Sequence, residues 1–476
     1  MVLVWLLAVP LLGAAAVLAV PNRSAKAWAA TGGLVELALF VLLWVSARHG
    51  VNWPWIAAWG IRFQLGADGL SLLMLGLTAV VFAAVLISSD AGAGRVYYFW
   101  LLLLEFASIG LFSALDLFLF YIFWEVLLIP VFFLLTGWGG EGGRSAAMRW
   151  LVMNLVGSLF MLVGIIAVGV LHSQLTGHLT FGIAQLAGTA WAPAVAPLLF
   201  LAFFLAFAIK APLWPLHGWM PEAYGRAPAP VTALLSGVLS KAGIYGFLRV
   251  MVPLFLPELR AYQTPLLILA AAGLVAGGLL ALRQQDMKMV AAYGSLSHMG
   301  MMALGVFSLT RAGVLGATFY MVAHGLMVGG LFLVLGLLEN RAGTRAIAAM
   351  KGLNRSAPRL AAYFLFFVLG SLGLPGLPGF AGEYMIIQGL VAHDVVIAVI
   401  AGAVLVLAAW YMLRAFQATM QGPVGNVAIP DLLARQVAWL LPLAAVVTVL
   451  GVWPSTLTLP AAPSLYHAIH LLAAKG

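Results

Sequence analysis

The chain has no cysteine and few charged residues. Charged side chains make up 8% of its 476 residues, whereas soluble globular proteins carry about 25%. The absence of cysteine excludes disulfides and cysteine-ligated iron–sulfur clusters. The sequence also has no GxxxxGK(S/T) loop and no GxGxxG turn that joins a strand to a helix, so we expect no nucleotide or redox cofactor on this chain. A soluble domain is excluded, and redox chemistry, where it is used, belongs to other chains.

Long apolar runs fill most of the sequence. Hydrophobic residues account for 64% of the chain, and the mean hydropathy is +1.10. A bilayer-spanning helix needs about 20 apolar residues, and fourteen stretches meet this requirement: 2–20, 27–46, 68–88, 96–114, 117–136, 146–171, 195–219, 229–251, 264–282, 288–308, 312–338, 358–386, 395–416 and 434–453. The runs are continuous rather than alternating, which indicates helices and not barrel strands. We therefore predict an all-α polytopic membrane protein in which residues 1–476 form a single membrane domain with about 14 transmembrane helices.

The basic residues predict the orientation in the membrane. Lys and Arg total 23, and alternate loops divide those outside the spans into sets of six and fifteen. The richer set should face the cytoplasm, which places both termini on the outer side of a cytoplasmic membrane. The first stretch has no preceding positive charge, so we expect a retained span rather than a signal peptide. The net charge of +9 then reflects topology, and we expect lipid and no nucleic acid as a partner.

Two segments resemble each other in an unusual way. AFAIKAPLWPLH, around 205–217, places Lys210 beside two prolines, and GSLGLPGLPGFAGEY, around 370–384, places Glu383 after two prolines. Proline removes a backbone donor, so each helix should break where it lines a polar cavity. Five spans lie in each of the blocks 96–251 and 264–416, and the odd number predicts two inverted five-helix repeats, each with a broken helix. The alternative is that the prolines only kink the helices for packing.

Ionisable side chains inside the spans are the candidate functional residues. Each one costs about 2.5–3.5 kcal/mol at the bilayer centre on insertion scales, so each indicates a function. Burial shifts carboxyl and amine pKa values toward neutrality, as proton transfer requires. The candidates for proton translocation are Glu125, Lys210, Lys241, His298, His324 and Glu383, with Glu105 and His217 as weaker ones.

Several of these candidates admit a second interpretation. Glu125 and Lys210 are either a switching pair or a static buried ion pair. His298 and His324 either pass protons, bind a haem iron from both sides as in b-type cytochromes, or make an ordinary interhelical hydrogen bond. Glu105 has Ser108 and Ser113 nearby as local partners. His217 lies near a span end, and we predict no metal site.

The motifs themselves resemble a known family. The antiporter-like membrane subunits of respiratory complex I and the related Mrp cation/proton antiporters share segments similar to KAPLWPLHGWMPEAYGRAPAPVTALLSGVLSKAGIYGFLR, FYIFWEVLLIP, SLSHMGMMALG, MVAHGLMVGGLF and LPGFAGEYMI. The resemblance covers about 96–416. A glutamate at the second break, here Glu383, resembles the M-type subunit, whereas the L-, N- and Mrp D-types have lysine there.

The resemblance implies roles for individual residues. Glu125 and Lys210 correspond to the first-half pair, Lys241 to the central lysine, and Glu383 to the terminal carboxylate. His298 and His324 correspond to the connecting histidines. The implied partners are the L-, N- and K-type membrane subunits and a hydrophilic redox arm.

Three functions follow as hypotheses. The first is a proton-translocating subunit of a type-I NADH:quinone oxidoreductase, driven by redox chemistry elsewhere in the assembly. The second is a subunit of an Mrp-type Na⁺/H⁺ antiporter or of a membrane-bound hydrogenase. The third is a membrane b-type cytochrome.

Overall fold

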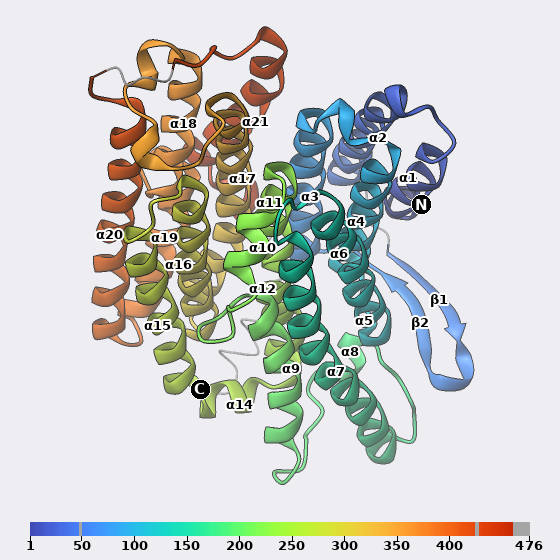
Figure 1. The fold of residues 1–476 in the computed structure, drawn as a ribbon. Coiled ribbons are helices and arrows are strands. Elements are labelled where there is room, and N and C mark those ends of the chain that lie inside the picture. The colour runs from blue at the N-terminus through green and yellow to red at the C-terminus, as the bar shows by residue number, and fades with distance from the viewer. Residues whose placement is uncertain (47–49, 424–427, 460–476) are drawn as a thin grey trace. The chain divides into compact units, whose positions relative to one another are not determined.

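The computed structural model describes residues 1–46, 50–423 and 428–459. These residues form two compact units (Figure 1). Among the described residues, unit 1 takes Met1–Ala211 and Lys241–Gln263, and unit 2 takes Pro212–Ser240 and the residues from Thr264 to 459. The C-terminal tail from residue 460, on which the predicted side of the C terminus depends, lies outside the described residues.

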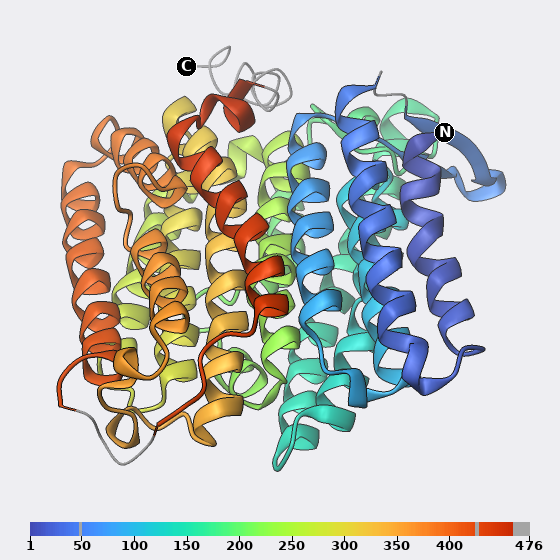
Figure 2. The same ribbon diagram turned by 90° about the horizontal axis from the view of Figure 1, so that it is seen from above.

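Unit 1 is a helical bundle with one small hairpin. Its helices are α1 (Val2–Val17), α2 (Asn22–Val45), α3 (Gly69–Ser88), α4 (Arg95–Ser113), α5 (Leu117–Val126), α6 (Leu128–Trp138), α7 (Gly143–Thr176), α8 (Ile183–Leu186), α9 (Ala196–Lys210), α12 (Lys241–Gly246), α13 (Val252–Leu254) and α14 (Leu256–Ala261). Helices α1, α2 and α3 lie side by side (Figure 2). The hairpin pairs β1 (Val51–Ile56) with β2 (Ile61–Leu65) antiparallel.

Unit 2 is also a helical bundle. Its helices are α10 (Met220–Arg226), α11 (Ala229–Leu234), α15 (Gln263–Leu282), α16 (Met287–Phe307), α17 (Arg311–Ala342), α18 (Pro358–Ser371), α19 (Pro378–Val391), α20 (Val395–Met420) and α21 (Ala434–Val452). Helix α17 is at its centre, packed against α11, α16, α18, α19 and α21.

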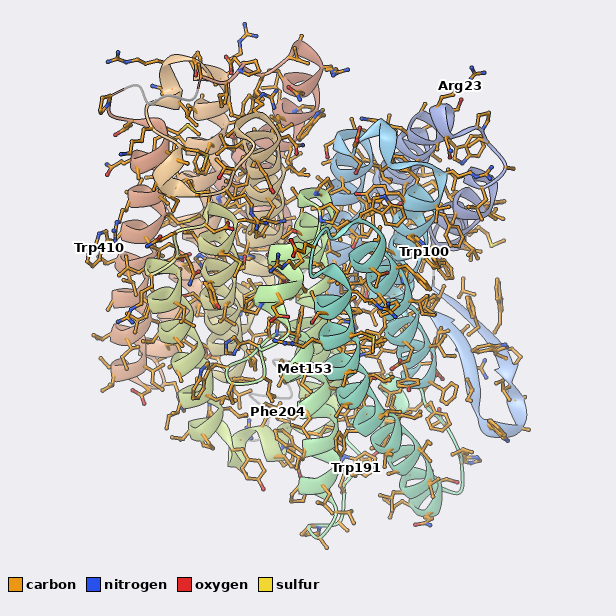
Figure 3. All side chains as sticks on the ribbon, in the orientation of Figure 1. Arg23, Trp100, Met153, Trp191, Phe204 and Trp410 are labelled. Atoms are coloured by element: carbon orange, nitrogen blue, oxygen red, sulfur yellow. The ribbon has the colours of Figure 1, made fainter. Side chains whose placement is uncertain are left out.

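The predicted membrane fold is confirmed. Among the described residues, eleven helices are long and apolar enough to span a bilayer, and three shorter apolar helices lie at other predicted spans. Large apolar side chains also project outward, such as Trp410 on α20, which is 60% exposed (Figure 3). The hairpin is an addition to the all-α prediction. The sequence marked its residues only as a connection between two spans.

Both predicted helix breaks are present. Helix α9 ends at Lys210, and the chain makes turns until α10 begins at Met220. Helix α18 ends at Ser371, and α19 begins at Pro378. Proline has no N–H to donate and suits the first turn of a helix, so the prolines end one helix and begin the next. The stretch predicted as one span over 358–386 is therefore two helices.

The span Ala229–Leu254 is irregular inside. Two π-helical segments, Leu235–Leu239 and Phe247–Met251, flank α12 on either side. Single π-helical turns within a helix occur frequently at functional sites. Lys241 is the first residue of α12 and is fully buried.

Helix α12 approaches α9 closely because of a glycine. A Cβ at Gly243 would lie 2.5 Å from the Phe207 carbonyl oxygen and 2.5 Å from the Ala211 nitrogen. Both are backbone atoms, which cannot move aside as a side chain does. Gly243 therefore sets the packing of the Lys241 helix against the end of the Lys210 helix.

We predict that Gly243→Ala destabilises the protein, because overpacking a tight core costs about 1–3 kcal/mol. Thermal unfolding of the purified protein measures the effect. Gly402→Ala on α20 is the matched control, since a Cβ there meets nothing within 4 Å. Equal melting temperatures for the two variants would contradict the proposed close approach.

Candidate functional site

Lys210 is a buried lysine in unit 1 that forms no ion pair among the described residues. Its side chain is 1% exposed, and Nζ has no hydrogen-bond partner in the described part of the chain. Nζ lies 5.2 Å from the ring centroid of Trp124 and 5.2 Å from that of Trp150. Cations are attracted to the faces of indole rings at such distances. The two indole rings thus stabilise the positive charge of Lys210 without a hydrogen bond to it.

Glu125 lies next to Trp124 on α5 and interacts electrostatically with Lys210. Its Oε1 atom is buried and has no hydrogen-bond partner among the described residues. The structure therefore brings the predicted pair into one environment but leaves it open, with the indole of Trp124 facing the ammonium. Such an arrangement can close or open when either group gains or loses a proton.

Small residues allow helix α7 to carry Trp150 toward Lys210. A Cβ at Gly157 on α7 would lie 3.3 Å from the Ala206 Cα, and one at Gly164 would lie 3.0 Å from Phe203. Small residues at such positions let transmembrane helices approach closely. The α7–α9 contact that places the ring over the ammonium depends on them.

In unit 2 the structure brings together His298, His324 and Glu383. His298 on α16 and His324 on α17 have ring centroids 5.1 Å apart, and His298 Nδ1 lies 3.9 Å from Glu383 Oε1 on α19. All three side chains are buried. The Glu383 carboxyl group also contacts the second helix break. Gly373 lies in this break, and a Cβ atom added to it would lie only 2.0 Å from Glu383 Oε2.

Tyr320 links two of these groups, and the sequence analysis missed it. Its hydroxyl donates to Glu383 Oε1 at 2.6 Å and lies 2.6 Å from His298 Nδ1. A hydroxyl that accepts on one side and donates on the other can pass a proton between its neighbours. The side chain is fully buried on α17.

Glycines bring α17 and α19 into contact at this point. A Cβ at Gly382 would lie 2.8 Å from the Cβ of Tyr320, and one at Gly316 would lie 2.8 Å from the Ile386 nitrogen. With no side chains between them, the helices approach closely enough for the tyrosine to reach the carboxylate.

The histidine pair does not fit a haem. Axial imidazoles stand on opposite faces of the macrocycle, whereas these rings are 5.1 Å apart and tilted by 51°. The Tyr320 ring also lies 5.9 Å from each of them. No space remains for a macrocycle between the two imidazoles.

The remaining predicted residues lie elsewhere. Lys241 is in unit 1 on α12, as described above. His217 is half-buried in unit 2, in the turns between α9 and α10. Glu105 is fully buried on α4, but Ser108 and Ser113 donate to backbone carbonyls instead. The local partners considered for Glu105 are therefore occupied.

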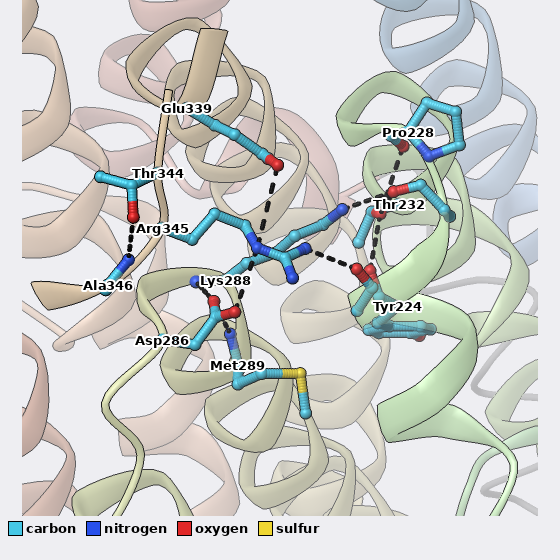
Figure 4. Close-up of polar contacts among 12 residues, drawn as sticks. Tyr224, Pro228, Thr232, Asp286, Lys288, Met289, Glu339, Thr344, Arg345 and Ala346 are labelled. Carbon is cyan, nitrogen blue, oxygen red and sulfur yellow. Dashed lines mark hydrogen bonds and ion pairs between the residues drawn. The ribbon is translucent and has the colours of Figure 1, made fainter. Parts of the chain in front are cut away.

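A polar cluster at one end of α16 and α17 was also not expected. Arg345 binds Asp286 at 3.0 Å and Glu339 at 3.8 Å (Figure 4). Lys288, the first residue of the predicted span 288–308, is 3% exposed and donates to the Ala227 carbonyl at 2.5 Å. Arg345 donates to the Gly225 carbonyl at 2.6 Å. Two cations thus bind the carbonyls at the end of α10, which a helix dipole favours.

We predict that Tyr320→Phe lowers proton transfer about tenfold or more, because positioned proton transfer contributes about 10²–10⁴ in rate. The substitution removes only the hydroxyl. Proton uptake or release coupled to turnover in reconstituted vesicles measures the effect.

The control is Tyr384→Phe on α19, which removes the hydroxyl of a tyrosine that is 58% exposed. This variant should retain the wild-type rate. If both tyrosine variants transfer protons equally well, the hydroxyl of Tyr320 is not part of the pathway.

Comparisons with known proteins identify the family to which this chain is similar. The family model described as NADH:quinone oxidoreductase/Mrp antiporter, transmembrane, matches residues 114–408. The NADH-quinone oxidoreductase subunit M of Rhodobacter capsulatus is 37% identical, with 96% of this chain and 94% of the relative covered. The subunit of the same name from Escherichia coli is 34% identical, with 95% of each chain covered.

Two solved structures are similar over the whole chain. A chain of respiratory complex I from Thermus thermophilus superposes with a TM-score of 0.92 at 34% identity, covering 99% of this chain and 100% of that one. A chain of the Mrp complex from a Dietzia species superposes with a TM-score of 0.88 at 25% identity, covering 100% of this chain and 99% of that one.

Proposed function

The chain belongs to the NADH:quinone oxidoreductase/Mrp antiporter family of membrane subunits, and from this premise we propose that it translocates protons as the M-type subunit of a type-I NADH:quinone oxidoreductase. The observation that carries the proposal is Lys210. Its ammonium is buried at a helix break, faces two indole rings and has no hydrogen-bond partner in the described residues. A charge held in this way responds strongly to any nearby change in charge.

The first step occurs at the open pair in unit 1. When Glu125 is ionised and approaches Lys210, the ammonium is stabilised and the lysine keeps its proton. When the carboxylate withdraws, the buried ammonium loses its counter-charge, and the neutral amine is favoured. The lysine then releases its proton, and the break after Lys210 provides backbone groups that a wet path requires.

The second step occurs in unit 2. A proton on His298 Nδ1 can pass to the Tyr320 oxygen as the tyrosine proton passes to Glu383 Oε1. The carboxyl group then holds the proton beside the break at Gly373. We propose that Glu383 releases it toward the outer side, and that Lys241 and His324 carry protons between the two steps.

We propose an M-type subunit rather than an Mrp antiporter subunit because of Glu383. The Mrp D-type subunits have a lysine at this position. The curated relatives named above are also called subunit M. We propose L-, N- and K-type membrane subunits and a hydrophilic redox arm as partners, with no redox centre on this chain. The bacterial cytoplasmic membrane is the proposed location, with the basic loops facing the cytoplasm.

We predict that Lys210→Ala abolishes or severely lowers proton translocation while leaving assembly largely intact, because it removes the switching charge. Quenching of a pH-sensitive dye in vesicles, divided by the rate of NADH oxidation, measures this. Lys351→Ala, which removes an exposed lysine, is the matched control and should pump normally. Normal quenching per NADH in Lys210→Ala would remove the basis of the proposal.

We further predict that Glu383→Gln fails almost as badly as Glu383→Ala. Glutamine keeps the size of the side chain and an oxygen that accepts from Tyr320, but it cannot take up a proton. The same dye assay compares the two variants. A glutamine variant that pumps at the wild-type rate, beside an alanine variant that fails, would reduce Glu383 to a structural hydrogen-bond acceptor.

A further inference from the structure

Two carboxyl groups in the N-terminal helices of unit 1 have no role in the steps above. Glu36 lies in the middle of α2 and Glu105 in the middle of α4, and both side chains are 0% exposed. An ionised carboxylate at this depth is strongly unfavourable unless something compensates its charge. The surroundings of the two groups therefore decide their state.

The packing of α2 on α4 brings the two groups together. At the start of both helices, the Arg95 N–H donates to Asn22 Oδ1 at 3.1 Å. Further along, a Cβ at Gly32 would lie 3.8 Å from Leu102 Cδ2. The helices thus start side by side and run parallel, and Glu36 and Glu105 each follow the Gly32–Leu102 contact by about one turn. The two carboxyl groups interact electrostatically.

No donor or cation in the described chain compensates this pair. All four carboxyl oxygens are buried without a hydrogen-bond partner. The nearby hydroxyls of Thr78 and Ser108 donate to backbone carbonyls instead, those of Met74 and Leu104.

The ionisable groups on the surrounding helices lie elsewhere. Helices α1, α3 and α6 carry none. Helices α5 and α12 and the η2 turn (Ala91–Ala93) also contact α4. The ionisable residues on or next to these elements, and near the starts of α2 and α4, are Arg23, Lys26, Asp90, Arg95, Tyr97, Tyr98, Tyr121, Glu125, Lys241 and Tyr245. Lys26, the lysine on α2, donates to the Ser89 carbonyl at 2.6 Å.

We infer that Glu36 and Glu105 form a proton-binding site, in which at least one of the two carboxyl groups stays protonated at neutral pH and donates to the other. Two adjacent carboxylates without a counter-ion repel each other, and a shared proton removes this repulsion. It also gives the oxygens the hydrogen bond that the protein does not supply. A metal cation fits less well, because the site offers it only these four oxygens.

The site goes beyond the proposed translocation steps and does not depend on them. Its Glu105 lies on α4, the helix that also contacts α5, with Glu125, and α12, with Lys241. A proton stored there lies on a helix that borders the groups of the first step.

Infrared difference spectroscopy of the intact purified assembly tests the inference, because a protonated carboxyl group has a C=O stretch that a carboxylate lacks. The variants are Glu36→Gln, Glu105→Gln and the double variant, in which glutamine preserves the packing. At neutral pH, the double variant should lose a protonated-carboxyl band that shifts in D₂O. Each single variant should shift the frequency of this band, because the remaining carboxyl group then faces an amide.

The control is Glu141→Gln, which removes an exposed carboxylate and should leave the protonated-carboxyl region unchanged. The inference would be overturned if the double variant lost only carboxylate bands and no protonated-carboxyl band. It would also be overturned if this loss of carboxylate bands came with the loss of a bound Na⁺. If the double variant does not assemble, the single variants decide: a protonated-carboxyl band that is unaltered in both contradicts the site. None of these outcomes depends on whether Lys210 pumps protons.

Discussion

Inside a bilayer every backbone N–H and C=O must find a partner within the protein, and the two places where this chain interrupts its helices determine the rest of the structure. Elsewhere along the described spans helical hydrogen bonds satisfy most of these groups, with π-helical segments on either side of α12. After Lys210 and after Ser371 the helical hydrogen bonds stop, and a proline lies in the first turn of the next helix. Free backbone groups at membrane depth are tolerated where they line a polar path. We therefore propose that protons reach the ionisable side chains at the two breaks.

The two breaks carry different chemistry. Lys210 is surrounded by indole rings and has no hydrogen-bond partner among the described residues, so its charge is stabilised weakly and depends on Glu125. Glu383, by contrast, accepts a short hydrogen bond from Tyr320, so its proton has a defined source. The first group suits a switch that changes its charge, and the second suits a carboxyl group that receives and holds a proton. Close helix packing through glycines makes both arrangements possible.

Much of this organisation could be predicted from the sequence because it depends on local properties. Runs of apolar residues mark the spans, paired prolines mark the breaks, and rare ionisable residues within the runs stand out. Tyr320 and Glu36 were missed for different reasons. A tyrosine in an apolar run is indistinguishable from a packing residue until its hydroxyl is seen beside a carboxylate. The pairing of Glu36 with Glu105 depends on the register between α2 and α4, which no local pattern contains. Likewise, Lys288 lies at the start of α16, where position in the sequence does not reveal burial.

The central claim is that Glu125 and Lys210 act as a coupled pair, and a double-mutant cycle on pumping rate tests it most directly. Glu125→Asp, Lys210→Arg and the double variant keep both charges but change the distance between them. Each rate of dye quenching in vesicles is divided by the rate of NADH oxidation. Coupled groups should give a double variant whose rate departs by more than about twofold from the product of the single effects, as expected for interacting residues. A double variant whose rate equals that product would contradict the account, because the two residues would then act independently.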